Sequence, residues 1–172
     1  MIPRLLLAAP SAILLAVGGC KAEAPIESSI CLGIPQTALA GHVTDVANIL
    51  NDREEAQLSE RLARYEARTK HQMVVATVPA LNGAQPIEYA TCLGRRWQIG
   101  RKDENDGILI LVAPNERQMS IATGHGIEKI LTDEKAKAVI VDQATPHFRS
   151  GDYFTGLSKG IESIAVQTGD NL

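Results

Sequence analysis

Three carboxylates crowd one short stretch of the chain and suggest metal chemistry. Asp103, Glu104 and Asp106 lie within four positions of one another, just before Gly107. Carboxylates this close repel one another unless a cation neutralises them, and oxygen ligands of this kind favour Ca²⁺ or Mg²⁺. The pattern therefore predicts a divalent-cation site, although it lacks the Glu at the twelfth position that an EF-hand loop requires. The alternative is a solvated acidic turn.

A second candidate is the Gly124-His125-Gly126 segment, which leads into a short helical stretch. Backbone N–H groups at a glycine-rich helix start can hold an anion, so Gly124 and Gly126 are candidate donors. His125 is suited to bind a ligand or to act as a general acid or base near neutral pH. Alternatively, the two glycines simply allow a tight reversal of the chain, since the segment matches no phosphate-binding loop pattern.

Other charged residues extend these candidates. Asp133 follows Thr132, a predicted helix cap, so its carboxylate either stabilises the helix N-terminus or joins the cation site. Asp45 and Arg117 form a second, separate candidate cluster. We expect Asp45 at the other end of the sheet, because the helix that follows it is about 25 Å long.

A hairpin positions the first two candidates. Strand-like runs at Ile108–Ala113 and Gln118–Ala122 flank a turn cluster, residues 114–117. In a hairpin the start of the first strand lies beside the end of the second. The acidic loop and the glycine segment should therefore meet at one end of the sheet.

The remaining elements predict the fold class. Asn51 with Glu54 begins a helix that runs to about Thr69, and the valine-rich run Gln72–Val78 suits a strand buried on both faces. Pro86 opens a crossover helix to the hairpin, which completes a right-handed parallel βαβ unit. Two further helices run from Thr132 to about Phe148 and through residues 154–164. We predict an α/β domain: a small mixed β-sheet, made of a parallel βαβ unit plus an antiparallel hairpin, with helices on both faces. The predicted core comprises Val74, Val75, Leu93, Ile108, Ile110, Val112, Ile121 and Ile161.

The N-terminus indicates export. Residues 1–19 have the short basic start and apolar run of a signal peptide, and Cys20 ends a segment that resembles a bacterial lipobox. A lipid on Cys20 would anchor the chain to a membrane on the periplasmic side of the cell envelope. Ordinary secretion with cleavage after Ala24, or an uncleaved anchor, are the alternatives. Residues 20–40 are predicted to be a lipidated linker and residues 41–168 the domain.

Charge and cysteine content narrow the function classes. The net charge is −3 and the basic residues are dispersed, so nucleic acid is not an expected partner. With Cys20 assigned to lipid, Cys31 and Cys92 remain. They are free to pair in an oxidising compartment, or Cys92 is simply a small buried helix residue.

An ordered series of segments resembles the TPM domain family. It comprises VTD (43–45), QMVVATV (72–78), WQIG (97–100), NDGILILVA (105–113), the strand at Arg117, TGHGIE (123–128) and LTD (131–133). The family includes thylakoid-lumen phosphatase-like proteins of photosystem II repair and bacterial membrane-associated proteins. The resemblance spans residues 41–165 and implies helices around a central sheet and an extracytoplasmic location. For some plant members it also implies divalent-metal binding and acid phosphatase activity.

Two functions follow as expectations. The first is a membrane-tethered module that binds, assembles or maintains envelope proteins, with any Ca²⁺ or Mg²⁺ serving structure. The alternative is a metal-dependent phosphatase acting on phosphomonoesters, in which Asp103 and Asp106 hold the metal. No activated serine or aspartyl-phosphate motif is present, so such an enzyme would need a metal-activated water.

Overall fold

The structure, a computed structural model, describes residues 31–170. The predicted signal peptide, Cys20 and the first part of the predicted linker lie outside the described residues. In chain order the elements are β1 (Val43–Asp45), α1 (Asp52–Thr69), β2 (Met73–Thr77), α2 (Pro86–Arg96), β3 (Ile108–Ala113), β4 (Gln118–Thr123), α3 (Asp133–Ala138), the π-helix η2 (Val139–Ala144), α4 (Thr145–Arg149) and α5 (Tyr153–Gln167). Within residues 31–170, no helix is long and apolar enough to span a membrane.

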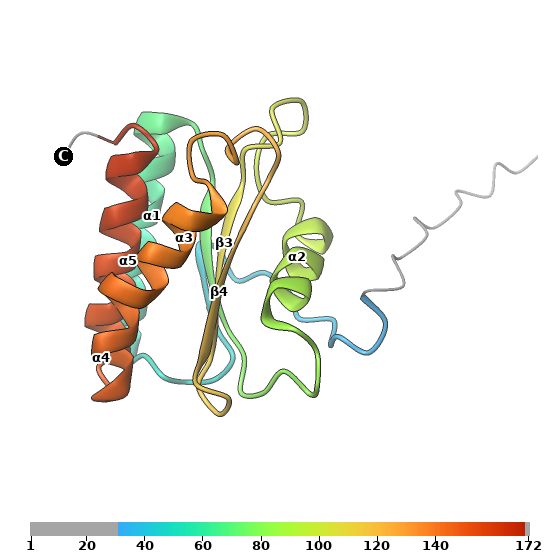
Figure 1. Ribbon diagram of the computed structural model, residues 1–172, viewed down its shortest axis with the longest axis vertical. Coiled ribbons are helices and arrows are strands. Elements are labelled where there is room, and N and C mark those ends of the chain that lie inside the picture. The colour runs from blue at the N-terminus through green and yellow to red at the C-terminus, as the bar shows by residue number, and fades with distance from the viewer. Residues whose placement is uncertain (1–30, 171–172) are drawn as a thin grey trace, which may run out of the picture.

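The four strands form one mixed sheet in the order β1-β2-β3-β4. β1, β2 and β3 are parallel, and β4 returns antiparallel to β3. Figure 1 shows the sheet as a narrow central band, with α2 on one side and the remaining helices on the other. The predicted fold class, a βαβ unit plus a hairpin with helices on both faces, is confirmed.

Local sequence signals account for α1. The Asn51 side chain accepts hydrogen bonds from the backbone N–H groups of Arg53 (3.1 Å) and Glu54 (3.0 Å), and the Glu54 carboxylate accepts one from Asn51 N–H at 2.9 Å. This reciprocal capping box gives hydrogen-bond partners to backbone N–H groups at the helix start, which have no partner within the helix. The apolar stripe of the helix then faces the sheet, where Leu58, Leu62 and Tyr65 are buried.

Two cores lie on the two faces of the sheet. Leu62, Ile110 and Ile161 belong to the core beneath α1 and α5, whereas Val74 and Leu93 belong to the core beneath α2. All eight residues predicted as core are buried.

The stretch predicted as one helix from Thr132 to Phe148 is interrupted. After α3 the backbone widens into η2, where the Thr145 N–H donates to the Ile140 carbonyl five residues back. The Thr145 hydroxyl donates to the same carbonyl at 2.7 Å. Pro146 follows, and because proline has no N–H it cannot continue the α-helical ladder. The prediction of an uninterrupted helix was therefore wrong here, although its position was right.

The predicted domain boundary at residue 41 also needs correction. Cys31 and Ile34 are buried in the core beneath α2, and Cys31 forms a disulfide with Cys92 of that helix. The pairing left open by the sequence is therefore present. Residues 31–40, which we call the N-terminal arm, are part of the domain rather than of a linker.

Two side chains from the end of α2 hold this arm in place. Arg96 donates to the carbonyls of Ile34 at 2.9 Å and Cys31 at 3.0 Å, and the Trp97 ring N–H donates to the Thr37 carbonyl at 2.8 Å. Residues 32–40 of the arm belong to no helix or strand, so side chains supply partners for several of its carbonyls. A Pro-containing segment without periodicity offered no signal for these contacts.

Candidate functional site

The acidic loop and the glycine segment meet at one end of the hairpin, as the strand pairing predicts. The N–H of Gly124 donates to the Gly107 carbonyl at 2.9 Å, and the N–H of Gly126 donates to the Asn105 carbonyl at 2.9 Å. The backbone of the glycine segment therefore packs directly against the backbone of the acidic loop. A Cβ atom at Gly124 would lie 2.1 Å from the Asn105 oxygen, and one at Gly126 would lie 1.9 Å from the Glu104 oxygen. Only glycine fits at either position.

This packing corrects the predicted anion site. The two N–H groups expected to face an anion, those of Gly124 and Gly126, already donate to protein carbonyls. The side chain of His125 between them is 85% exposed and its Nδ1 lies 3.0 Å from the Glu128 carboxylate. The segment therefore serves to join two loops, and only the His125 side chain remains available to a ligand.

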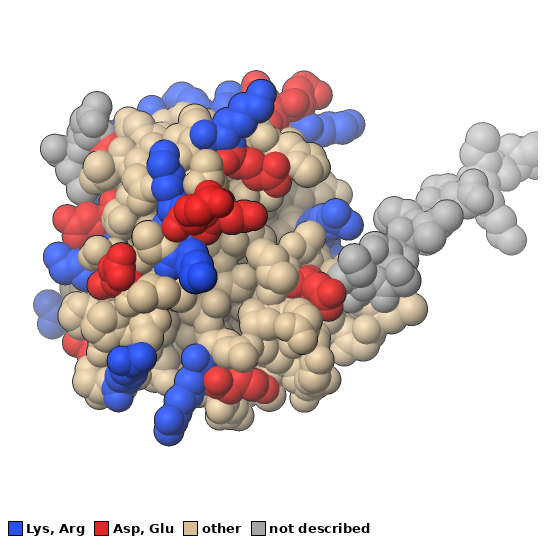
Figure 2. All heavy atoms as spheres, viewed as in Figure 1, with Lys and Arg blue, Asp and Glu red and all other residues tan. Residues whose placement is uncertain are grey.

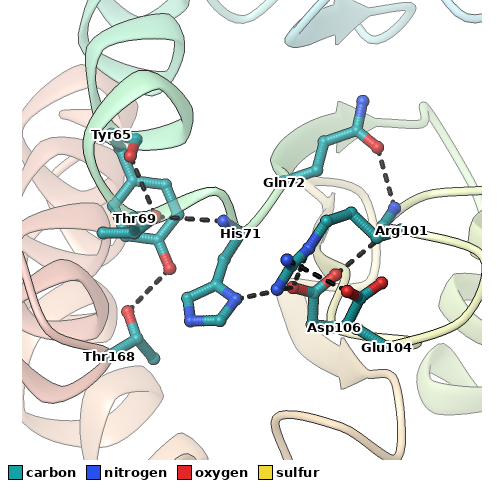
Figure 3. Close-up of polar contacts among 9 residues, drawn as sticks. Tyr65, Thr69, His71, Gln72, Arg101, Glu104, Asp106 and Thr168 are labelled. Carbon is teal, nitrogen blue, oxygen red and sulfur yellow. Dashed lines mark hydrogen bonds and ion pairs between the residues drawn. The ribbon is translucent and has the colours of Figure 1, made fainter.

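Asp106, predicted as a metal ligand, is instead paired with basic groups. It is 2% exposed, and its carboxylate accepts hydrogen bonds from the Arg101 backbone N–H (2.9 Å), from Arg101 Nε (2.9 Å) and from the terminal Arg101 nitrogen (2.5 Å). His71 Nδ1 lies 2.7 Å from the same carboxylate. Figure 3 shows these groups converging on Asp106 from two sides. A carboxylate so surrounded is neutralised by the protein itself.

The ionisation of Asp106 follows from these contacts. Burial alone would raise the pKa of this carboxyl. The hydrogen bonds from the Arg101 side chain and backbone and from His71 have the larger, opposite effect, and the pKa falls to about 2. Asp106 is therefore a fully ionised, fully paired group near neutral pH.

A hydrogen-bond chain links Asp106 to the opposite helical layer. The His71 N–H donates to the Thr69 hydroxyl at 3.1 Å, and that hydroxyl donates to the Tyr65 carbonyl at 2.9 Å. The Tyr65 hydroxyl lies 2.7 Å from the Thr168 hydroxyl beyond α5, and burial raises the pKa of Tyr65. The acidic loop, α1 and the end of α5 thus share one polar network (Figure 3).

Sequence reasoning missed both partners of Asp106. His71 is 35 residues away in the chain, and nothing local marks the contact. Arg101 is only five residues away, so its charge beside three carboxylates was a usable signal.

The other predicted metal ligands remain at the surface. Glu104 makes an exposed ion pair with Arg101 at 3.2 Å, and Asp103 and Asp133 are exposed. Asp133 is the first residue of α3, whose cap is Thr132 as predicted. Within the described range, no three or more His, Cys, Asp or Glu residues are grouped so that they could hold a metal ion. The arrangement does not fit a Ca²⁺ or Mg²⁺ cage, which needs several converging oxygens.

A surface cleft of about 720 Å³ lies between α2, the acidic loop and the glycine segment. Ile87, Thr91 and Gly94 of α2 form one wall, and Ala122 and Thr123 belong to its strand wall. Its charged and titratable lining residues are Arg95, Arg101, Lys102, His125, Glu128 and Asp133. Arg101 is already paired with Asp106, so Arg95 and Lys102 are the basic side chains of the lining that can meet an acidic group of a partner, and Glu128 and Asp133 are its carboxylates.

Asp45 and Arg117, predicted as a second cluster, are at the same end of the sheet but not together. Asp45 ends β1 and Arg117 precedes β4, which are opposite edges of the sheet. Three strand spacings separate those edges, about 14 Å. Asp45 accepts hydrogen bonds from the Leu50 N–H at 2.8 Å and from the Thr77 hydroxyl, so it shapes the loop after β1.

Arg117 lines a different cleft, of about 700 Å³, between β4, η2 and α4. Met119, Ile140 and Phe148 supply apolar lining, and Arg149 adds a second guanidinium. The hairpin turn and the helical layer thus form a hollow of their own, far from the acidic loop.

Known structures share this architecture. The N-terminal domain of a protein from P. gingivalis, solved by NMR in solution, is 31% identical with a TM-score of 0.68, over 73% of this chain and 80% of that chain. The N-terminal domain of the cg2496 protein from Corynebacterium glutamicum is 15% identical with a TM-score of 0.60, over 82% and 88% of the two chains. The BA42 protein from Bizionia argentinensis is 19% identical with a TM-score of 0.62, over 72% and 83%.

No curated protein matches the chain. The family model of the TPM domain matches residues 43–167, which include every strand and helix of the sheet sandwich. The hairpin, the acidic loop and the glycine segment all fall inside that match. The chain therefore belongs to the TPM domain family.

Proposed function

We propose that the chain is a membrane-tethered, extracytoplasmic TPM domain that binds other proteins of the cell envelope and supports their assembly or maintenance. The observation that carries the proposal is the cleft between α2 and the two loops. Arg95 and Lys102 line it, and the one buried carboxylate nearby, Asp106, is already paired. Such a cleft can hold an acidic group of a partner without any chemical step.

The proposed location rests on separate support. The Cys31–Cys92 disulfide is of the kind that persists in oxidising compartments such as the periplasm. The lipobox-like segment before Cys20 supplies the proposed anchor, since a lipidated N-terminus holds a domain at the membrane surface. Cys20→Ser is expected to move the chain from the membrane fraction to the aqueous phase in detergent phase partitioning. A chain that stays in the membrane fraction after this change would contradict the lipid anchor.

Crosslinking in living cells tests the binding proposal. A photoreactive amino acid at Thr91, inside the cleft, should give discrete adducts with one or a few envelope proteins. The matched control is Gln57, an exposed residue of α1 in the other helical layer. Arg95→Glu together with Lys102→Glu should abolish the Thr91 adducts. Equal adducts from both positions, or none from Thr91, would refute a binding role for the cleft.

The alternative proposal is a metal-dependent phosphatase, and it draws support from the same cleft, because Arg95 and Lys102 suit a phosphate group. Its metal would have to bind the exposed carboxylates Asp103, Glu104 and Asp133, which are not grouped as a ligand set. Calorimetric titration with Ca²⁺, Mg²⁺ and Mn²⁺ separates the two proposals. Micromolar binding that Asp103→Asn/Glu104→Gln abolishes, with cation-dependent hydrolysis of p-nitrophenyl phosphate, would favour the enzyme.

A further inference from the structure

The outer edge of β4 presents unpaired backbone groups. The Gly124 N–H donates to the Gly107 carbonyl, which makes these two residues a hydrogen-bonded pair of the hairpin. Bonded and non-bonded pairs alternate along an antiparallel ladder. Met119, Ile121 and Thr123 therefore direct their N–H and C=O groups away from β3. No other residue in the described part of the chain pairs with these groups, because β4 is the last strand of the sheet.

β4 also lacks the features by which proteins usually block an open edge. Its six residues, Gln118–Thr123, include no charge, no proline and no glycine. The opposite edge, β1, has only three residues, and the Ala40 N–H folds back onto the Thr44 hydroxyl at 3.0 Å. Short edge strands and covering segments prevent pairing between molecules, so β1 is protected and β4 is not. In Figure 1 no helix passes in front of β4.

We propose that a second copy of this chain pairs with β4 in antiparallel orientation, which joins two four-stranded sheets into one. The outward groups fix the register. With a two-fold axis at Ile121, Ile121 of one copy pairs with Ile121 of the other, and Met119 of each copy pairs with Thr123 of the other. Each residue then exchanges both of its hydrogen bonds, and side chains on the same face of the sheet lie opposite one another.

The charges along the edge fit this register. Arg117 and Arg149, near the start of β4, form no ion pair with any residue between 31 and 170. Two-fold pairing places the turn that carries Arg117 near the segment that follows β4 in the second copy, which carries Glu128. Figure 2 shows a mostly uncharged area below and to the right of the centre of this side, with basic side chains and an acidic one along its lower edge. Antiparallel pairing thus brings Arg117 toward the end of β4 at which the carboxylates Glu128 and Asp133 lie in one cleft with Arg95 and Lys102.

The proposed symmetry agrees with tethering to one membrane. The two-fold axis of an antiparallel strand pair is perpendicular to the sheet, so the α2 layers of both copies lie on the same face. The N-terminal arm is bonded to α2 through Cys31 and Cys92, and both arms therefore start from that face. This agreement rests on the proposed lipid anchor, whereas the strand pairing does not depend on it.

Sedimentation equilibrium of the full chain in density-matched detergent tests the proposal. The expected result is a reversible dimer whose Kd rises at least about tenfold in Thr123→Pro. Proline removes one N–H in each copy, so the dimer loses two hydrogen bonds. Proline is tolerated where the N–H faces away from the sheet. Thr123→Val, which keeps the N–H, is the matched control and should change the Kd less than about twofold. Amide exchange at Met119, Ile121 and Thr123 should slow as protein concentration rises.

Three outcomes would overturn the proposal. They are a chain that is monomeric at about 1 mM, a dimer that a folded Thr123→Pro variant leaves unchanged, and a dimer unaffected by Arg117→Glu. The last variant remains informative if Thr123→Pro does not fold. Arg117→Glu is expected to weaken the dimer, and adding Glu128→Arg in both copies is expected to restore it.

Discussion

The two faces of the sheet are covered by very different layers. α1, α5 and the η2 region share one face, where their side chains form the larger core. The other face has a single helix, α2, and the N-terminal arm. The thin layer is reinforced by the Cys31–Cys92 disulfide and by Arg96 and Trp97, whereas the thick layer combines a larger apolar core with polar contacts between α1 and the end of α5. A layer with little surface to bury therefore depends on covalent and polar attachment of a neighbouring segment.

The strongest test of this contrast is to remove the disulfide. Cys31 and Cys92 are 61 residues apart, and the chain-entropy model assigns a crosslink of this span about 4 kcal/mol. Reduction should lower the free energy of unfolding by about that amount in urea titrations. The Cys31→Ser/Cys92→Ser variant should show the same loss and no response to reductant. A reduced protein as stable as the oxidised one would show that packing alone holds the arm.

Matched truncations in the two cores sharpen the comparison. Leu62 and Leu93 are both fully buried, one in each layer. Leu62→Ala and Leu93→Ala should each cost about 3 kcal/mol, because they leave cavities of similar size. The Leu93→Ala loss should be non-additive with disulfide removal, since Leu93 adjoins Cys92, and the Leu62→Ala loss should add independently. Equal coupling in both layers would argue against separate cores.

Asp106 joins the two layers, because His71 follows α1 and Arg101 follows α2. Asp106→Asn should lower the free energy of unfolding by about 2 kcal/mol near neutral pH, the loss of a buried charge-assisted network. The folded pKa of about 2 lies below the ordinary value of 3.8. The contribution of this residue is therefore complete above about pH 5 and disappears as the pH falls toward 2. Urea titrations at several pH values should show a smaller acid dependence in the variant.

The smallest expected effect concerns the link between α1 and α5. Tyr65→Phe removes the hydroxyl that lies 2.7 Å from Thr168 and should cost about 1 kcal/mol. A double-mutant cycle with Thr168→Val measures the coupling between the two hydroxyls. Additive losses would mean that these two hydroxyls do not stabilise each other, which would leave Arg68–Asp170 as the polar contact between α1 and the end of α5.

The sequence predicted the fold well because its signals are local. The capping pair Asn51 and Glu54, the valine-rich run of β2 and the spacing of the hairpin each specify one element without reference to the rest. Register and crossover rules then restrict how such elements combine. The meeting of the acidic loop with the glycine segment also followed from this logic, since it depends only on hairpin geometry.

The site was less predictable because its contacts are not local. His71 reaches Asp106 from the start of the neighbouring strand β2, and the N–H groups of Gly124 and Gly126 donate to carbonyls of another loop. Asp106 and the two glycines are residue types that can bind a cation or an anion, but in the fold they bind partners within the protein. The N-terminal arm was missed for the same reason, since the residues that hold it belong to α2.

The disulfide also determines how the domain would carry mechanical load. A pull applied upstream of Cys31 passes through the sulfur bridge into α2, so β1, α1 and β2 lie within a closed loop that bears no tension. The 61 residues of that loop would not extend under force, which shortens the unfolded contour by about 200 Å. A domain held at a membrane by its N-terminus would thus be pulled through α2, while the longest helix stays unloaded.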